Sequence, residues 1–316
     1  MTLSGAAGVA SHLCYFIGGE HHREVKKLLG LTFAIPVTIT AIQIHILRIH
    51  CGQANINTIS MMLAYFAALF MSMGIYRLYV HPLRDFPGPR AMRVSKLGHV
   101  LRSRKLDNYL QLDLLRQQYG DFVRTGPNEL TIFRPDAHIA LHGPQSKCTK
   151  AVWYDMTWPT ISLQTTRDKA DHSRRRRIWD RAFSVKAING YEPRVVRHIN
   201  ELERKLAMSK EIKQSSVEVD VTNLFNFLIF DIMGDVSFGV EFNLVKTGKM
   251  HFAIEKMRAG LIPVGILSPV PWLFRILTAI PGVLRPWNQL LGWCREESAR
   301  RLKVDHCLPP STAYLR

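Results

Sequence analysis

Two long runs of apolar residues near the N-terminus are the strongest feature of the hydropathy pattern. Residues 28–47 carry no acidic or basic side chain apart from the titratable His45, and residues 58–76 carry none at all. Crossing the hydrocarbon core of a bilayer takes a helix of about 20 apolar residues, so each run is long enough. We therefore expect transmembrane helices at about 28–47 and 58–76. Two helices buried in a protein core are the alternative.

Basic residues flank both runs and predict their orientation. Arg23, Lys26 and Lys27 precede the first run, while Arg77 and Arg84 follow the second. Because cytosolic loops are enriched in Lys and Arg, both flanks are expected to face the cytosol, with residues 85–316 on the same side. The shorter apolar stretch at residues 6–17 has no basic segment before it, so we do not expect a cleaved signal peptide.

Beyond the second run, the pattern changes to that of a folded, mostly helical protein. Residues 106–119 have helical apolar spacing and end at Gly120, and residues 121–133 (DFVRTGPNELTIF) predict two strands around a Gly-Pro turn. Longer helices are expected at 191–206 and 220–238. In the second of these, Asp231 and Asp235 share one face, which favours a core helix over a membrane span. The pattern predicts a mainly α fold with a small β sheet.

Composition narrows the possible functions. The net charge of +17 suits an anionic surface, but no nucleic-acid-binding motif accompanies it, so we expect a membrane surface and no nucleic acid as the partner. The five cysteines are scattered without a CxxC pair, which argues against a disulfide framework and for a reducing compartment. They form no metal site with nearby histidines.

Residues 172–184 (HSRRRRIWDRAFS) carry the most informative local pattern. His172 and Arg176 lie four residues apart, so on a helix they share one face and can reach the same anion. The segment resembles the C helix of cytochrome P450 monooxygenases, in which a Trp or His and a basic residue one turn later hold a haem propionate. The resemblance implies haem as the cofactor, with His172 and Arg176 as its binding residues. A solvated basic helix face is the alternative.

Other segments extend this resemblance over residues 77–303. Residues 77–89 (RLYVHPLRDFPGP) are similar to the proline-rich junction of fungal P450s, 230–239 (FDIMGDVSFG) to the E helix, and 287–303 to the G helix. Residues 262–286 resemble the F–G region, which borders the membrane in the family; an ordinary apolar loop is equally compatible. The resemblance implies an endoplasmic reticulum membrane protein of fungal secondary metabolism. Its partners would be NADPH-cytochrome P450 reductase and a small hydrophobic substrate.

The family's catalytic signatures are missing from the sequence. No cysteine lies in a Phe-x-x-Gly-x-x-x-Cys-x-Gly segment, no Glu-x-x-Arg pair precedes a Pro-x-Arg-Phe segment, and the acidic-Thr motif of the I helix is absent. A P450 needs the cysteine thiolate on its haem iron. We therefore assign no catalytic residue and no metal ligand, and expect monooxygenase ancestry without activity in this chain. A non-enzymatic, membrane-anchored remnant or a partner-binding protein is the alternative.

The expected organisation has four parts. Residues 304–316 lose helical periodicity and contain Pro309-Pro310, as a frameshift, an unspliced intron or a genuine early stop would each produce. The remaining residues match only the N-terminal half of the P450 fold. The predicted parts are a membrane anchor at 1–80, a proline-rich hinge at 81–95, a partial P450 domain at 96–303 and an aberrant tail at 304–316.

Overall fold

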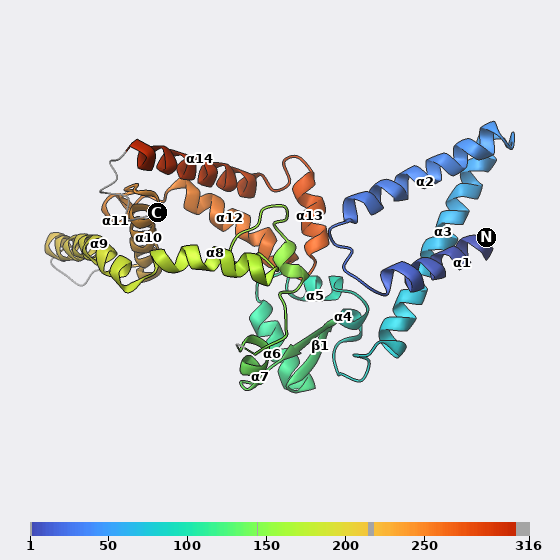
Figure 1. The fold of residues 1–316 in the computed structure, drawn as a ribbon, viewed down its shortest axis with the longest axis horizontal. Helices are drawn as coiled ribbons and strands as arrows, with labels where there is room; N and C mark the ends of the chain where they lie inside the picture. The colour runs from blue at the N-terminus through green and yellow to red at the C-terminus, as the bar shows by residue number, and fades with distance from the viewer. Residues whose placement is uncertain (1, 144, 214–217, 308–316) are drawn as a thin grey trace. The chain divides into compact units, whose positions relative to one another are not determined.

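The computed structural model of the chain describes residues 2–143, 145–213 and 218–307 (Figure 1). Helices dominate these residues, and the strands found among them form a single two-stranded antiparallel sheet. This confirms the mainly α fold with a small sheet. The chain divides into two compact units, Met1–Ile161 with Val264–Ile280, and Ser162–Pro263 with Pro281–Arg316.

The first unit contains the apolar N-terminal helices, the hairpin and several short helices. Its elements are α1 (Thr2–Ser11), the π-helix η1 (His12–Phe16), α2 (Val25–His45), α3 (Cys51–Ile75), the π-helix η2 (Tyr76–Val80), α4 (Arg90–Val94), α5 (Leu97–Arg102), α6 (Asn108–Tyr119), β1 (Phe122–Gly126), β2 (Glu129–Ile132), α7 (Ala137–His142), the 3-10 helix η3 (Val152–Asp155) and α13 (Pro271–Ala279). Together, α6, β1 and β2 confirm the helix and hairpin that the sequence predicts.

The second unit consists of helices. Its elements are α8 (Lys169–Ala182), α9 (Val185–Lys213), α10 (Val221–Met233), the π-helix η4 (Gly234–Phe238), α11 (Leu244–Thr247), most of α12 (Phe252–Leu267) and α14 (Arg285–Cys307). Two helices exceed their predicted bounds: α9 begins before and ends after 191–206, and α14 continues to Cys307, past the predicted start of the aberrant tail. The rest of that tail, 308–316, lies outside the described residues.

Helices α2 and α3 coincide with the two apolar runs, and many of their large apolar side chains are exposed. Phe33 is 72% exposed and Leu63 is 67% exposed. A helix with apolar residues on all faces that no protein covers is suited to a lipid environment. Among the described residues, three helical stretches are long and apolar enough to cross a membrane: Val25–His45, Cys51–Val80 and Val221–Phe238.

A small polar network connects α2 to α3. The Thr40 hydroxyl donates to Thr58 Oγ1 at 2.9 Å, and the Gln43 amide nitrogen donates to the same oxygen at 3.1 Å. Asn57 Nδ2 donates to Gln43 Oε1 at 3.2 Å. Hydrogen bonds between helices in apolar surroundings fix their rotation and register, because unpaired polar groups are costly there. The network therefore specifies how the two apolar helices pair.

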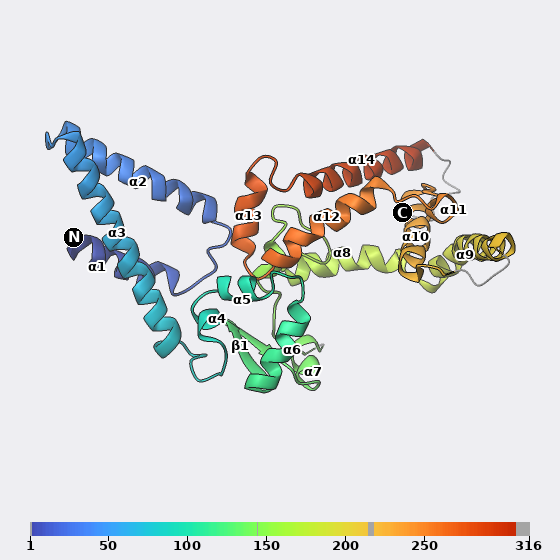
Figure 2. The same cartoon turned by 180° about the vertical axis from the view of Figure 1, so that it is seen from behind.

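Helix α1 lies against α3, as Figures 1 and 2 show from opposite sides. A Cβ atom on Gly8 would lie 2.3 Å from the Tyr65 carbonyl oxygen, so glycine permits the close approach of the two backbones. The Tyr65 hydroxyl donates to Ser11 Oγ at 3.0 Å, and His12 Nδ1 lies 2.8 Å from Ser72 Oγ. The short N-terminal apolar stretch is thus a third helix beside α3.

The proline-rich segment at residues 86–89 is attached to strand β1. Arg124 N donates to the Pro87 carbonyl oxygen at 2.8 Å, and a Cβ on Gly88 would lie 2.4 Å from the Arg124 carbonyl oxygen. The Arg124 side chain is fully buried and donates from Nη2 to the Pro127 carbonyl at 2.7 Å. Met92, Leu115 and Val123 form the adjacent hydrophobic core. The predicted hinge is therefore packed against the hairpin.

In the second unit, two buried carboxylates organise the core around Leu202, Leu228 and Val245. Asp231 accepts hydrogen bonds from the backbone nitrogens of Leu244 and Val245, both at 2.9 Å. Asp235 pairs with Arg197 at 3.0 Å and lies 3.3 Å from His198 Nε2. These partners belong to other protein segments, which supports the prediction that 220–238 is a core helix despite its apolar composition.

Candidate functional site

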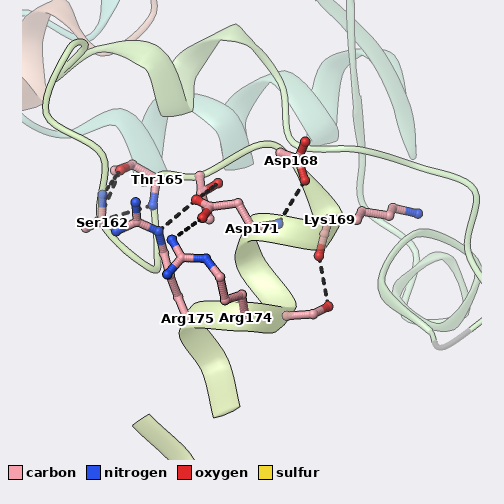
Figure 3. Close-up of polar contacts among 9 residues, drawn as sticks. Ser162, Thr165, Asp168, Lys169, Asp171, Arg174 and Arg175 are labelled. Carbon is pink, nitrogen blue, oxygen red and sulfur yellow. Dashed lines mark hydrogen bonds and ion pairs between the residues drawn. The ribbon is translucent and has the colours of Figure 1, made fainter. Parts of the chain in front are cut away.

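Helix α8, which carries His172 and Arg176, has a well-formed N-terminus (Figure 3). Asp168 is the N-cap, and its Oδ1 accepts a hydrogen bond from Asp171 N at 2.9 Å. A carboxylate at this position satisfies a backbone donor that has no partner inside the helix. The preceding turn is closed by Ser162 N donating to Thr165 Oγ1 at 2.7 Å. These local contacts explain why the helix begins at Lys169.

The Asp171 carboxylate is the centre of the polar contacts in Figure 3. Arg174 Nη2 lies 2.6 Å from Oδ1, Arg175 Nε lies 2.7 Å from Oδ2, and the Thr166 hydroxyl donates to Oδ2 at 3.1 Å. The hydrogen bond from Arg174, followed by that from Arg175, lowers the pKa of Asp171 from 3.8 to about 2. Two arginines of the basic run are therefore already paired within α8.

His172 and Arg176 lie one turn apart on α8, as their spacing predicts. The Arg176 guanidinium, however, pairs with Asp180 one turn further on, with Nε 2.6 Å from Oδ1. His172 is half-buried, and within the described part of the chain the two side chains share no hydrogen-bond partner. The structure thus places His172 and Arg176 on one helix face, but the two side chains do not bind a common anionic group among the described residues.

A second polar cluster lies in the first unit around the buried Asp155. Arg23 donates to its carboxylate from Nε at 3.1 Å and from Nη2 at 2.9 Å, and His22 Nε2 lies 2.8 Å from Oδ2. The Arg23 guanidinium also lies over the Trp158 ring, 4.3 Å from its centre. With Glu20, this group has the donor types of a metal site. The permanent charge of Arg23 on both carboxylate oxygens opposes a cation there.

Comparison with known proteins decides the family. The profile of the family described as Cytochrome P450 matches residues 87–283. The chain belongs to the cytochrome P450 family. This confirms the resemblance that the C-helix, proline-rich junction and E-helix segments carry.

Fungal P450 monooxygenases resemble the chain over almost its whole length. It is 32% identical to a tryprostatin B 6-hydroxylase of Neosartorya fischeri, covering 100% of this chain and 58% of that protein. It is 35% identical to the cytochrome P450 monooxygenases notG' of Aspergillus versicolor and FCK2 of Fusarium pseudograminearum, covering 99% and 98% of this chain. In both cases 56% of the relative is covered, so the chain spans little more than half the length of these P450s. No solved structure matches the chain.

The P450 family uses haem, whose propionate groups are anions that an exposed cation can pair with. Arg176 is exposed, and an exposed ion pair such as that with Asp180 contributes only about 0.2–1 kcal/mol, so Arg176 can exchange its partner for a propionate. The iron has no corresponding ligand among the described cysteines. Cys14, Cys51 and Cys148 are exposed, and burial raises the pKa of the half-buried Cys294, which favours the thiol over the thiolate.

Sequence reasoning missed the pairing of Asp171 and the Asp155 cluster. The Asp171 ion pairs could have been predicted from the sequence, because Asp171 precedes Arg174 and Arg175 by three and four residues, the spacing of helix ion pairs. The Asp155 cluster joins residues 22 and 23 to residue 155, so no pattern within one sequence segment indicates it. Trp179 and Phe183, read only as part of the family motif, stack in the structure with ring centres 5.8 Å apart, and both are exposed.

We expect the Asp171 carboxyl group of the full chain to titrate near pH 2, measured by carboxyl carbon chemical shifts. Because the folded pKa is lowered, the stabilisation of α8 by Asp171 is present above pH 3.8 and is lost as the pH falls through about 2. Arg174→Gln should move the titration toward 3.8. Arg177→Gln removes one charge from a neighbouring position and is the matched control. An equal shift in both variants would contradict a specific Asp171–Arg174 contact.

Proposed function

We propose that the chain is the N-terminal part of a membrane-anchored P450 monooxygenase of fungal secondary metabolism, and that these residues alone have no monooxygenase activity. Two observations together support this proposal. The P450 family model matches residues 87–283, and no cysteine of the sequence lies in a haem-binding loop segment. A non-enzymatic membrane-anchored or partner-binding role is the alternative, and the same missing cysteine favours it.

In the proposed complete enzyme, a haem held through a cysteine thiolate would supply oxygen activation, with electrons from NADPH-cytochrome P450 reductase. The residues of α8 would contribute electrostatics, because His172 and Arg176 would hold a haem propionate from one helix face. Hydrogen bonds to a charged group are stronger than neutral ones, so this contact orients and retains the cofactor. The substrate is a small hydrophobic metabolite, a proposal that the tryprostatin B 6-hydroxylase among the relatives supports.

The proposed location is the endoplasmic reticulum membrane, with α2 and α3 as its spans. The outward-facing apolar side chains of both helices and the basic residues Arg23, Lys26 and Lys27 before α2 support this arrangement. Residues 85–316 would then lie in the cytosol. This places the P450 portion on the side where a cytosolic reductase domain can deliver electrons.

The isolated chain should show no Soret band of a reduced thiolate-haem carbon monoxide complex. The physical reason is that an axial thiolate has no substitute in this sequence. The measurement is a carbon monoxide difference spectrum of the purified chain after haem supplementation. As the matched positive control, a full-length fungal relative expressed in the same way should show the band. Stoichiometric haem with a thiolate spectrum in the isolated chain would overturn the proposed inactivity.

In a longer form that carries the haem-binding cysteine, Arg176→Ala should lower haem retention about tenfold or more, since a hydrogen bond to a charged group contributes about 1.5–3 kcal/mol. Arg174→Ala should have little effect, because Arg174 lies about 200° around the helix from Arg176. The measurement is haem content per polypeptide after gel filtration. Equal losses in both variants would mean that Arg176 is part of a generic basic face and would contradict its assigned role.

A further inference from the structure

A cavity of about 690 Å³ lies between α1, η1, α2 and α3 in the first unit. We call it the anchor cavity. Most of its lining is apolar, and typical members are Ala7 of α1, Leu31, Ile35 and Ile39 of α2, and Met62 and Phe66 of α3. Cavities that bind a small ligand measure about 300–1,000 Å³. The anchor cavity therefore has the size and the chemistry of a binding site for a long apolar group.

One end of the anchor cavity carries a pair of opposite charges. Glu24 and Lys27, at the start of α2, both line it. The Tyr15 hydroxyl donates a hydrogen bond to Glu24 Oε2, which orients the carboxylate. Within the described residues, Lys27 has no ion pair. The neighbouring Arg23 is engaged with Asp155, so Lys27 is the ammonium group available at this end.

The depth of the anchor cavity matches one leaflet of a bilayer. Its lining on α2 runs from Lys27 to Ile39, which is about 18 Å along a helix that rises 1.5 Å per residue. Half of a hydrocarbon core about 30 Å thick is about 15 Å. A ligand with its polar end at Lys27 would therefore extend to about the middle of the membrane.

We propose that the anchor cavity binds one zwitterionic phospholipid of the cytosolic leaflet, with an acyl chain along α2, its phosphate at Lys27 and its ammonium group at Glu24. This rests on the proposed membrane anchorage of α2 and α3. The Phe16 ring lines the same end and can attract an ammonium group through its face, while the neighbouring Tyr15 ring packs against that of His21, with ring centres 4.0 Å apart. The Glu24 carboxylate would repel a headgroup with net negative charge, which disfavours an anionic phospholipid.

The test uses the full chain reconstituted in nanodiscs that contain equal amounts of phosphatidylcholine, phosphatidylethanolamine and phosphatidylglycerol. After extraction into detergent, native mass spectrometry counts the lipids that remain bound. We expect one retained lipid per chain, with the zwitterionic species favoured over phosphatidylglycerol by about threefold or more, the range of an exposed ion pair. Preferential retention of phosphatidylglycerol would overturn the proposal, as would absence of a retained lipid.

Variants separate the two charged contacts. Glu24→Gln should abolish the discrimination against phosphatidylglycerol, and Lys27→Ala should lower the retention of all three lipids. Lys26→Ala removes the same charge from a residue outside the cavity lining and should change neither property. Leu31→Trp should place a bulky ring in the path of the acyl chain and lower lipid retention while far-ultraviolet circular dichroism stays unchanged. If Lys26→Ala and Lys27→Ala have equal effects, the headgroup contact is wrong.

Alkaline carbonate extraction of microsomes that contain the full chain separates this proposal from the anchorage on which it rests. A chain that stays in the pellet but retains no lipid contradicts the lipid site and leaves the membrane spans standing. A chain that is released to the supernatant contradicts the spans themselves. A pelleted chain that retains one zwitterionic lipid supports both.

Discussion

The apolar surface of α2 and α3 is the constraint on which the first unit depends. Side chains such as Phe33 and Leu63 project from these helices without protein contacts that cover them. Removing a large apolar side chain from water is worth about 1.5–3 kcal/mol, so a row of them has to reach an apolar phase. The polar groups that remain on the helices pair with one another, as Thr40, Gln43 and Thr58 do. The pairing of α2 with α3 follows from these contacts, and the position of α1 follows from the close approach of Gly8 to Tyr65 and the hydrogen bond between Tyr65 and Ser11.

The same reasoning explains why Val221–Phe238 differs from the two N-terminal helices, although its length and composition also suit a membrane. Asp231 is buried and receives two backbone N–H groups, and Asp235 pairs with basic side chains of α9. Buried charges are tolerated when they are paired and hydrogen-bonded by protein. If this helix were transferred from the protein into lipid, all of these contacts would be broken. The helix therefore belongs to the protein core. Composition alone does not separate the two cases, but carboxylate position does.

Much of the fold could be predicted because its signals are local. Helical spacing and Gly120 define α6, and the Gly-Pro turn defines the hairpin of β1 and β2. Contacts between distant segments could not be predicted in this way. The bond from Arg124 N to the Pro87 carbonyl and the cluster of His22, Arg23 and Asp155 depend on the tertiary fold. At the candidate site the helix and its family are predictable, and the competing Arg176–Asp180 pair also has a local signal, the i,i+4 spacing of helix ion pairs.

The central claim is that α2 and α3 form a membrane hairpin whose connection faces away from the P450 portion. Two native cysteines report on it, since Cys51 begins α3 between the spans and Cys148 lies in the P450 portion, and both are exposed. The measurement is labelling by a membrane-impermeant maleimide in sealed microsomes, using variants that retain one cysteine each. Cys148 should react at once, and Cys51 should react only after detergent opens the vesicles. Labelling of Cys51 and Cys148 to the same extent in intact vesicles would contradict the membrane hairpin.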